Sequence, residues 1–209
     1  MYTMAAKKLI FILLWCVVAT GHAKELMFDV FMDEDLVGTH LYEIENNNVV
    51  SKANYRIKVL FMNFTYKHES FETYDDGCLT AIHSMTNDDG DNYKVSGKGS
   101  AQGMQITANG KEINLPGCIS TFTYWDADVV NKKQLLNAQN AEWLDIEASR
   151  IGDAVISVQG KAVKTQHHRL KASLKGYEKF IIELWYDENG NWVKLLSPTA
   201  AGDLIYKLH

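Results

Sequence analysis

Proline is almost absent from this chain of 209 residues, which contains only Pro116 and Pro198. Because proline breaks helix interiors and cannot donate a hydrogen bond to a neighbouring strand, its scarcity permits long regular elements. The sequence also lacks a Gly-x-Ser-x-Gly elbow, a His-Glu-x-x-His helix, a phosphate-binding loop and a dinucleotide glycine fingerprint. We therefore expect neither an enzyme of these classes nor a cofactor.

Long hydrophobic runs are missing except near the N-terminus. Two lysines precede the apolar residues 9–19, and small residues follow up to Ala23. This order is typical of a secretory signal peptide, so residues 1–23 are predicted to be removed by cleavage near Ala23. No second run of about 18 apolar residues follows, so residues 24–209 are expected to lack a transmembrane segment. The predicted location is the periplasm or the extracellular space.

A basic excess is missing as well. After the first 23 residues the chain has 19 basic and 26 acidic residues, a net charge of −7 with histidine neutral. Mild acidity favours solubility and disfavours contact with a phosphate backbone, so no nucleic-acid partner is expected. The length of residues 24–209 fits a single domain.

Cysteine is rare, and only Cys78 and Cys118 lie beyond the N-terminal segment. In an oxidising compartment this predicts one disulfide, which would close a loop of about 40 residues and contribute roughly 3 to 4 kcal/mol. The alternative is two buried free thiols packed as small apolar side chains. A redox-active pair is disfavoured because the two residues do not form a Cys-x-x-Cys unit.

Apolar and polar residues alternate with a period of two along most of the chain, and the helical period hardly occurs. This pattern predicts a mainly β protein: a strongly curled antiparallel meander of roughly a dozen strands that forms a barrel or half-barrel. The expected strands are residues 28–32, 37–44, 55–59, 64–74, 79–85, 93–97, 104–108, 144–150, 154–158, 164–174, 180–186 and 192–196. Turn signals lie at residues 33–35, 75–77, 87–90, 109–110, 152–153, 160–161 and 189–190.

The meander is interrupted near residues 116–140. There Asp126 is predicted to cap a short helix that runs through Val129, Val130 and Leu136. This insertion contains the densest group of aromatic and amide side chains in the sequence. We therefore expect specialised geometry in it.

The candidate ligand-binding residues are Tyr124, Trp125, Asn137 and Gln139. In this interpretation the two aromatic residues form a lid or mouth, and the two amides donate or accept hydrogen bonds at the head group of a ligand. In the alternative, Tyr124 and Trp125 plug one end of the sheet together with Phe122, and the amides bond the backbone of their own loop.

No metal site is predicted. His40, His68 and His83 lie on three expected strands and meet only if the sheet brings them together. The acidic turns at residues 88–91 and 187–191 lack the twelve-residue calcium pattern with its closing Glu, and such turns are expected between strands.

Four stretches of the chain carry a family resemblance: residues 115–118, 121–125, 135–137 and 184–194. Together they resemble an exported proteobacterial family of unknown function, domain-of-unknown-function class 6134, which is distantly similar to class 3108. The likeness covers nearly all of the chain after the signal peptide. It implies a periplasmic, strongly curled antiparallel sheet, and it supplies neither an assigned activity nor catalytic residues.

Three functions are compatible with these observations. A carrier or sensor of a lipid or other hydrophobic molecule predicts a lined, partly empty cavity inside the curled sheet. An envelope assembly or interaction protein, which recognises a protein partner through exposed aromatics or a sheet edge, predicts a filled barrel and an apolar surface patch. An unrecognised hydrolase predicts acids or histidines that converge in a cleft. We favour the first and expect no enzyme.

Overall fold

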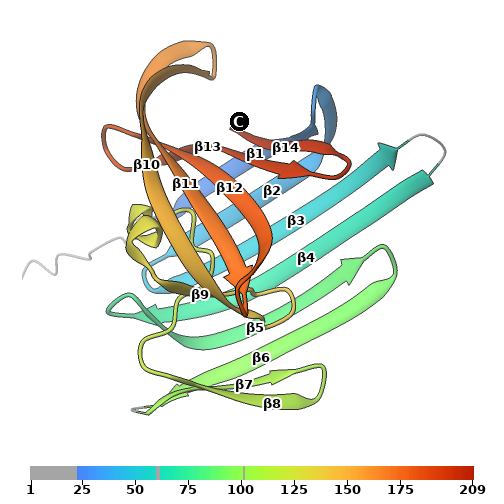
Figure 1. Ribbon diagram of the computed structural model, residues 1–209, viewed down its shortest axis with the longest axis vertical. Helices are drawn as coiled ribbons and strands as arrows, with labels where there is room; N and C mark the ends of the chain where they lie inside the picture. Colours follow the sequence, from blue (N-terminus) through green and yellow to red (C-terminus); the bar gives the residue numbers. More distant parts are fainter. Residues whose placement is uncertain (1–22, 60–61, 101) are drawn as a thin grey trace, which may run out of the picture.

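The computed structural model describes residues 23–59, 62–100 and 102–209 (Figure 1). The signal peptide expected at residues 1–23 lies outside this part of the chain, apart from Ala23. The described strands are β1 (Lys24–Met32), β2 (Asp35–Glu45), β3 (Asn48–Val59), β4 (Met62–Asp75), β5 (Cys78–Asp88), β6 (Asp91–Ser100), β7 (Gly103–Ala108), β8 (Lys111–Pro116), β9 (Gln134–Leu136), β10 (Trp143–Val158), β11 (Lys161–Leu174), β12 (Tyr177–Asp187), β13 (Trp192–Thr199) and β14 (Gly202–Leu208). The prediction of a mainly β protein is confirmed.

All fourteen strands belong to one sheet, in the order β8-β7-β6-β5-β4-β3-β2-β1-β14-β13-β12-β11-β10-β9. Each strand pairs antiparallel with its neighbours, and the end strands β8 and β9 do not pair with each other. The sheet is therefore open, and it curls so that β10–β12 cross the face of β2–β5 (Figure 1). Of the two predicted forms, the structure is nearer the half-barrel. Among the described residues, no helix has the length and apolarity needed to cross a membrane.

Tight turns connect many of the strands, as the sequence predicts. Asp76 and Gly77 join β4 to β5, and both have positive φ angles, 49° and 73°. Asn109 and Gly110 join β7 to β8 with φ angles of 47° and 81°. Positive φ at both central residues matches the right-handed twist of the flanking strands, and Asp, Asn and Gly adopt it most easily.

One predicted turn is wrong. Residues 152–153 do not separate two strands, because β10 runs without a break from Trp143 to Val158. The register against β11 shifts between Arg150 and Gly152, which leaves Ile151 as an extra residue. Gly152 therefore marks a β-bulge, and the glycine that indicated a turn instead accommodates the bend in a long strand. Three short strands, β8, β9 and β14, were not predicted.

The insertion near residues 116–140 is present, but its helix is shorter than predicted. A 3-10 helix, η1, spans Ala127–Asn131, and the Asp126 carboxylate accepts a hydrogen bond from the Asp128 backbone N–H as its N-cap. The helix does not reach Leu136, which lies in β9 and donates its backbone N–H to Ser120 O at 2.9 Å. Pairing with the sheet therefore prevents the helix from continuing.

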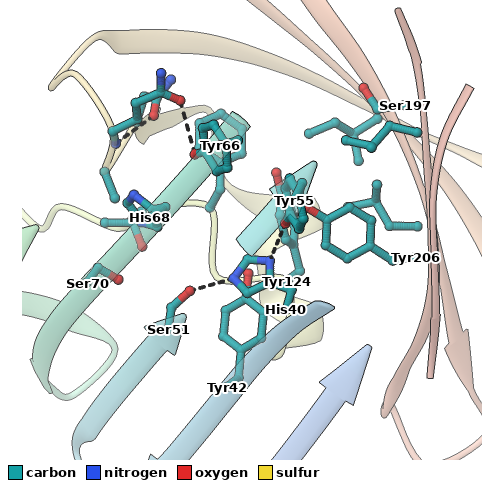
Figure 2. A pocket seen from close by; sticks show the side chains of 18 of the residues that line it. His40, Tyr42, Ser51, Tyr55, Tyr66, His68, Ser70, Tyr124, Ser197 and Tyr206 are labelled. Carbon is teal, nitrogen blue, oxygen red and sulfur yellow. Dashed lines mark hydrogen bonds between the residues drawn. The ribbon is translucent and has the colours of Figure 1, made fainter. Parts of the chain in front are cut away.

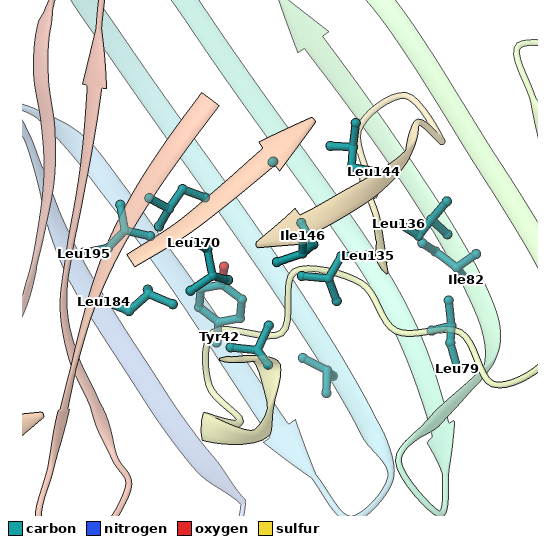
Figure 3. Packing of buried hydrophobic residues seen from close by; sticks show 14 of the residues in the cluster. Tyr42, Leu79, Ile82, Leu135, Leu136, Leu144, Ile146, Leu170, Leu184 and Leu195 are labelled. Atoms are coloured by element: carbon teal, nitrogen blue, oxygen red, sulfur yellow. The ribbon is translucent and has the colours of Figure 1, made fainter. Parts of the chain in front are cut away.

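The inner face of the sheet carries the hydrophobic core. Phe28 of β1 is fully buried, and its ring centroid lies 4.0 Å from that of Trp192 of β13. Towards β5, Leu135, Leu136 and Leu144 fill the interior (Figure 3). The core thus joins strands from both halves of the chain.

Candidate functional site

A cavity of about 510 Å³ lies on the inner face of the curled sheet (Figure 2). Its walls are formed by β2–β4, by β12–β14, and by residues 121–125 and 137–139 of the insertion. This volume lies in the range of about 300 to 1,000 Å³ that is usual for small-molecule sites.

The strand register gathers polar side chains on one wall of the cavity. His40 of β2 lies opposite Ala53 of β3, which in turn lies opposite His68 of β4. Two residues further along β3 and β4, Ser51 lies opposite Ser70. Because alternate residues of a strand point to the same face, these four polar residues all line the cavity.

A chain of hydrogen bonds crosses this wall (Figure 2). Ser51 Oγ lies 2.6 Å from His40 Nε2, and the Tyr55 hydroxyl lies 3.1 Å from His40 Nδ1. The Tyr55 hydroxyl is also 2.6 Å from that of Tyr206. The Tyr42 ring stacks on the His40 ring with centroids 4.3 Å apart. The chain thereby links β2 and β3 to β14, from the other end of the sequence.

Glu72 of β4 is a buried acid at the inner end of the cavity. Its carboxylate accepts hydrogen bonds from Ser70 Oγ at 3.1 Å, the Tyr74 hydroxyl at 2.5 Å and Thr121 Oγ1 at 2.8 Å. Burial raises the pKa of Glu72, and the three hydroxyl donors partly offset this effect. Because Thr121 belongs to the insertion, the cluster also attaches the insertion to β4.

The histidines and tyrosines of the cavity wall are held in their neutral forms. Burial lowers the pKa of His40 to about 3, with a further contribution from His68, and burial alone lowers the pKa of His68 to about 4. Burial also raises the pKa of five tyrosines that line the cavity: Tyr42, Tyr55, Tyr66, Tyr124 and Tyr206. At pH 7 this wall therefore presents imidazoles and phenols without charge.

Tyr124 and Trp125, the two predicted aromatic residues, both line the cavity. The Tyr124 ring centroid lies 5.3 Å from that of Trp192. The backbone oxygen of Tyr124 accepts a hydrogen bond from the Tyr186 hydroxyl at 2.9 Å. Trp125 packs edge-on against Tyr74. Both aromatic residues therefore pack against the end of the sheet, as the alternative of a plug predicts, and both also form part of the cavity wall. Their part in binding stays a prediction.

Asn137 and Gln139 also line the cavity, but their amides already have partners within the chain. Asn137 Oδ1 accepts the backbone N–H of Gln139 at 2.9 Å. Gln139 accepts a hydrogen bond from the Tyr66 hydroxyl and donates one to Asp88, each at 3.2 Å. The two bonds of Gln139 fasten the insertion to β4 and β5, whereas the Asn137 bond lies within the insertion. Contact of either amide with a ligand stays a prediction.

The predicted disulfide between Cys78 and Cys118 is present, with an S–S distance of 2.08 Å. It joins the start of β5 to the insertion. Beside it, the backbone N–H of Leu79 donates to Ile119 O at 2.8 Å. The insertion is thus covalently fixed at the inner end of the cavity.

The polar wall was not predicted as a site. Of the three histidines considered from the sequence, His40 and His68 share the cavity, whereas His83 is exposed and does not line it. The signal that could have revealed the wall is the occurrence of His or Ser at inward positions of adjacent strands, where alternation alone predicts apolar residues.

The acidic turns show ordinary turn bonding. Asp187 accepts the backbone N–H groups of Asn189 and Asn191, each at 2.8 Å, as expected for a turn between strands. In the described part of the chain, no group of three or more His, Cys, Asp or Glu side chains is arranged to hold a metal ion.

Residues 28–209 match the family model "Domain of unknown function (DUF6134)". The chain belongs to the DUF6134 family. A solved structure, the "Beta-barrel-like Protein of Domain of Unknown Function DUF1849 from Brucella abortus", matches with a TM-score of 0.67 and 11% identity, over 90% of this chain and 95% of that chain. This likeness supports the shared fold. A second solved structure is a DUF1329 family protein from Desulfovibrio piger, with a TM-score of 0.24 and 12% identity over 90% of this chain and 82% of that chain. A TM-score this low does not support a shared fold. No curated protein matches.

Proposed function

We propose that this DUF6134 protein binds one small hydrophobic molecule, such as a lipid, in the cavity on the inner face of its sheet. The main support is an internal space of about 510 Å³ whose wall includes polar atoms without partners. Within the described residues, the Tyr124 hydroxyl and His68 Nε2 have no hydrogen-bond partner in the protein, although His68 Nδ1 bonds Thr86 Oγ1. No buried polar side-chain atom of the described residues lacks a partner, so these two atoms are accessible to solvent. A packed core leaves few voids and few unpaired polar groups, so these atoms are available to a ligand.

Apolar side chains on several strands and on the insertion provide surface for such a ligand to bury. They are Val49, Ile57, Phe64, Phe122, Phe180, Ile182, Leu195 and Leu204. Elsewhere on the inner face, leucine and isoleucine side chains fill the interior (Figure 3). The fold therefore accommodates a filled interior beside the cavity, which supports a binding role for the unfilled part.

The hydrolase alternative has one observation in its favour, the Ser51–His40 contact, because a serine bonded to a histidine is the core of many acyl-transfer sites. Two features disfavour it. The residue bonded to the other ring nitrogen of His40 is the neutral Tyr55, which cannot stabilise an imidazolium as the carboxylate of a catalytic triad does. In addition, burial lowers the pKa of His40 to about 3. Such a histidine is a poor base at pH 7, so we assign the pair to structure and ligand contact.

The protein-interaction alternative predicts an apolar patch on the surface. The large exposed apolar residues in the described part of the chain are Leu36, Phe71, Met85, Ile151, Val155 and Tyr177, and they are distributed over β2, β4, β5, β10 and β12. Phe71 and Met85 are diagonal neighbours on the paired strands β4 and β5, and a pair of exposed apolar residues is usual on soluble proteins. This distribution gives less support to a partner than the cavity gives to a ligand.

We further propose that the protein acts outside the cytoplasm, in the periplasm or as a secreted protein. The predicted signal peptide and the Cys78–Cys118 disulfide support this location, since disulfides persist in oxidising compartments. Cell fractionation combined with N-terminal sequencing tests it. The expected product begins at Lys24, whereas an intact N-terminus in the cytoplasmic fraction refutes the location.

Native mass spectrometry tests the binding proposal. The protein, purified without detergent from its own compartment, is expected to carry a small molecule at near one-to-one stoichiometry, and organic extraction identifies it. Ser197→Phe places a large side chain at the cavity wall and should abolish the adduct. Leu196→Phe is the matched control, because adjacent residues of a strand point to opposite faces. Protein without an adduct that also fails to take up added amphiphiles refutes the proposal.

A further inference from the structure

The cavity wall contains carboxylic acids but no lysine or arginine among its described residues. The described residues that line it include two acids, Glu72 and Asp88, and neither lysine nor arginine. Glu72 is buried, whereas Asp88 lies at the exposed edge and accepts a hydrogen bond from Gln139. The cavity therefore holds no cation that could pair with an anionic head group.

The burial of the lining side chains changes along the cavity. At its inner end, beside the insertion, Ser70 is 1% exposed, Ser51 is 6% exposed and His40 is 7% exposed. At the opposite end, Ile57 and Phe64 are half-buried, and the polar residues Thr65, Asp88 and Gln139 lie beside them in the cavity wall. Figure 2 shows Ser51 and Ser70 at one end of the view and Ser197, beyond Tyr55 and Tyr206, at the other. The polar groups of the inner end are thus deep, whereas the opposite end is nearer solvent and carries apolar and polar side chains together.

The inner end is also the closed end. The Thr121–Glu72 hydrogen bond, the contact of Trp125 with Tyr74 and the disulfide all fix the insertion there. Entry from the inner end would require breaking these contacts. A ligand therefore enters past Ile57 and Phe64 and reaches the serines and histidines last.

We infer that the ligand has an uncharged polar head bearing hydroxyl or carbonyl groups, and that this head lies at the inner end while the apolar part lies towards the opening. The inference rests on the proposed binding function and specifies its ligand class. Phenol hydroxyls and neutral imidazoles both donate and accept hydrogen bonds, which suits hydroxyl and carbonyl partners.

Anionic amphiphiles are disfavoured by the same geometry. A carboxylate at the inner end would lose hydration, would meet no cation, and would lie on the same wall as Glu72. Burying an unpaired charge costs far more than burying a neutral group whose hydrogen bonds are made. Fatty-acid carboxylates should therefore bind much more weakly than neutral molecules with the same chain.

A series of ligands with one chain length tests the head chemistry. The probes are octyl β-glucoside, octanoate and octyltrimethylammonium, each titrated below its micelle concentration into the delipidated full-length mature protein and followed by calorimetry. We expect octyl glucoside to bind at least about tenfold more tightly than octanoate. Equal or tighter binding of octanoate or of the ammonium compound overturns the inference.

Enlarging the ligand at either end tests its direction. Octyl maltoside extends the head and should bind at least about tenfold more weakly than octyl glucoside, because the inner end is closed. Dodecyl glucoside extends the chain towards the opening and should bind no more weakly than octyl glucoside. The opposite ranking overturns the assigned direction.

Tyr124→Phe tests the polar contact without disturbing a bond within the protein, because its hydroxyl makes none among the described residues. We expect affinity for octyl glucoside to fall about fivefold, the loss typical of one neutral hydrogen bond. Tyr177→Phe is the matched control, since Tyr177 is 79% exposed. An unchanged affinity in Tyr124→Phe contradicts a head group at this hydroxyl.

The two proposals fail differently. If octanoate binds and Ser197→Phe blocks it while octyl glucoside does not bind, the cavity is a binding site and the assigned head chemistry is wrong. If none of the amphiphiles binds and the native protein carries no adduct, the proposed function itself is refuted.

Discussion

The two buried imidazoles should make the protein less stable as the pH falls below 7. His40 and His68 are neutral in the folded protein because burial lowers their pKa to about 3 and about 4. In the unfolded chain each takes up a proton near pH 6.5. Between these values the unfolded chain binds more protons than the folded chain, so acidification favours unfolding.

The expected size of this effect follows from the shifts. At pH 5 an unfolded histidine is almost fully protonated while the folded one is neutral, which costs about 2 kcal/mol per residue relative to pH 7.5. The two residues together predict a loss of about 4 kcal/mol. Glu72 acts in the opposite direction, because its raised folded-state pKa makes acidification above pH 4.5 favour the folded state. The predicted loss is therefore an upper value.

Urea unfolding followed by tryptophan fluorescence at pH 7.5, 6 and 5 measures this loss. His68→Gln should remove about half of the pH dependence, whatever it does to stability at pH 7.5. His83→Gln is the matched control, because His83 is exposed on a neighbouring strand. A pH dependence between pH 7.5 and 5 that is as large in His68→Gln as in the wild type would refute the assignment of a neutral His68 in the folded protein.

Three further predictions concern stability, each measured by urea unfolding at pH 7.5. The double variant Cys78→Ala/Cys118→Ala should lose about 3 kcal/mol, and reduction of the wild-type disulfide should reproduce this loss; no effect of reduction contradicts it. Gly38→Ala should lose about 2 to 3 kcal/mol, because a Cβ there would lie 2.0 Å from Asn54 O in β3; a stable variant would contradict this close approach of β2 and β3. Phe28→Ala should lose about 3 to 5 kcal/mol, since Phe28 is fully buried against Trp192, and a loss below about 1 kcal/mol would disagree with that packing.

Alternation and turn residues predicted most of the sheet because both signals are local. The β1–β2 hairpin has the expected inward residues: Phe28 and Val30 are fully buried. Gly152 misled the prediction because a glycine at a bulge and a glycine at a turn look alike in sequence; only the continuous pairing of β10 with β11 distinguishes them. The short strands β8, β9 and β14 have little alternation, and they form because neighbouring strands supply partners.

The site was predictable only where its residues are unusual in composition. The insertion was identified because it concentrates aromatic and amide side chains, and Tyr124 and Trp125 do line the cavity. The polar wall depends on register: Ser51 meets Ser70 only because the β3–β4 pairing places them opposite each other. Tyr206 joins Tyr55 across most of the chain length, a contact that follows from the pairing of β1 with β14. No local pattern encodes such a contact.

The polar residues of the cavity are difficult to explain as a means of stabilising the fold. Burying an imidazole or a carboxylic acid costs free energy, and here the hydrogen bonds of His40 and Glu72 offset that cost without filling the adjacent space. Apolar side chains of suitable size would fill the space and add burial, as Leu135 and Leu144 do elsewhere on the inner face. A bound molecule with an apolar part and an uncharged polar head would complete both kinds of contact at once. The combination of empty volume, polar atoms that have no protein partner and a closed end with buried polar groups is therefore accounted for by a ligand more fully than by packing alone.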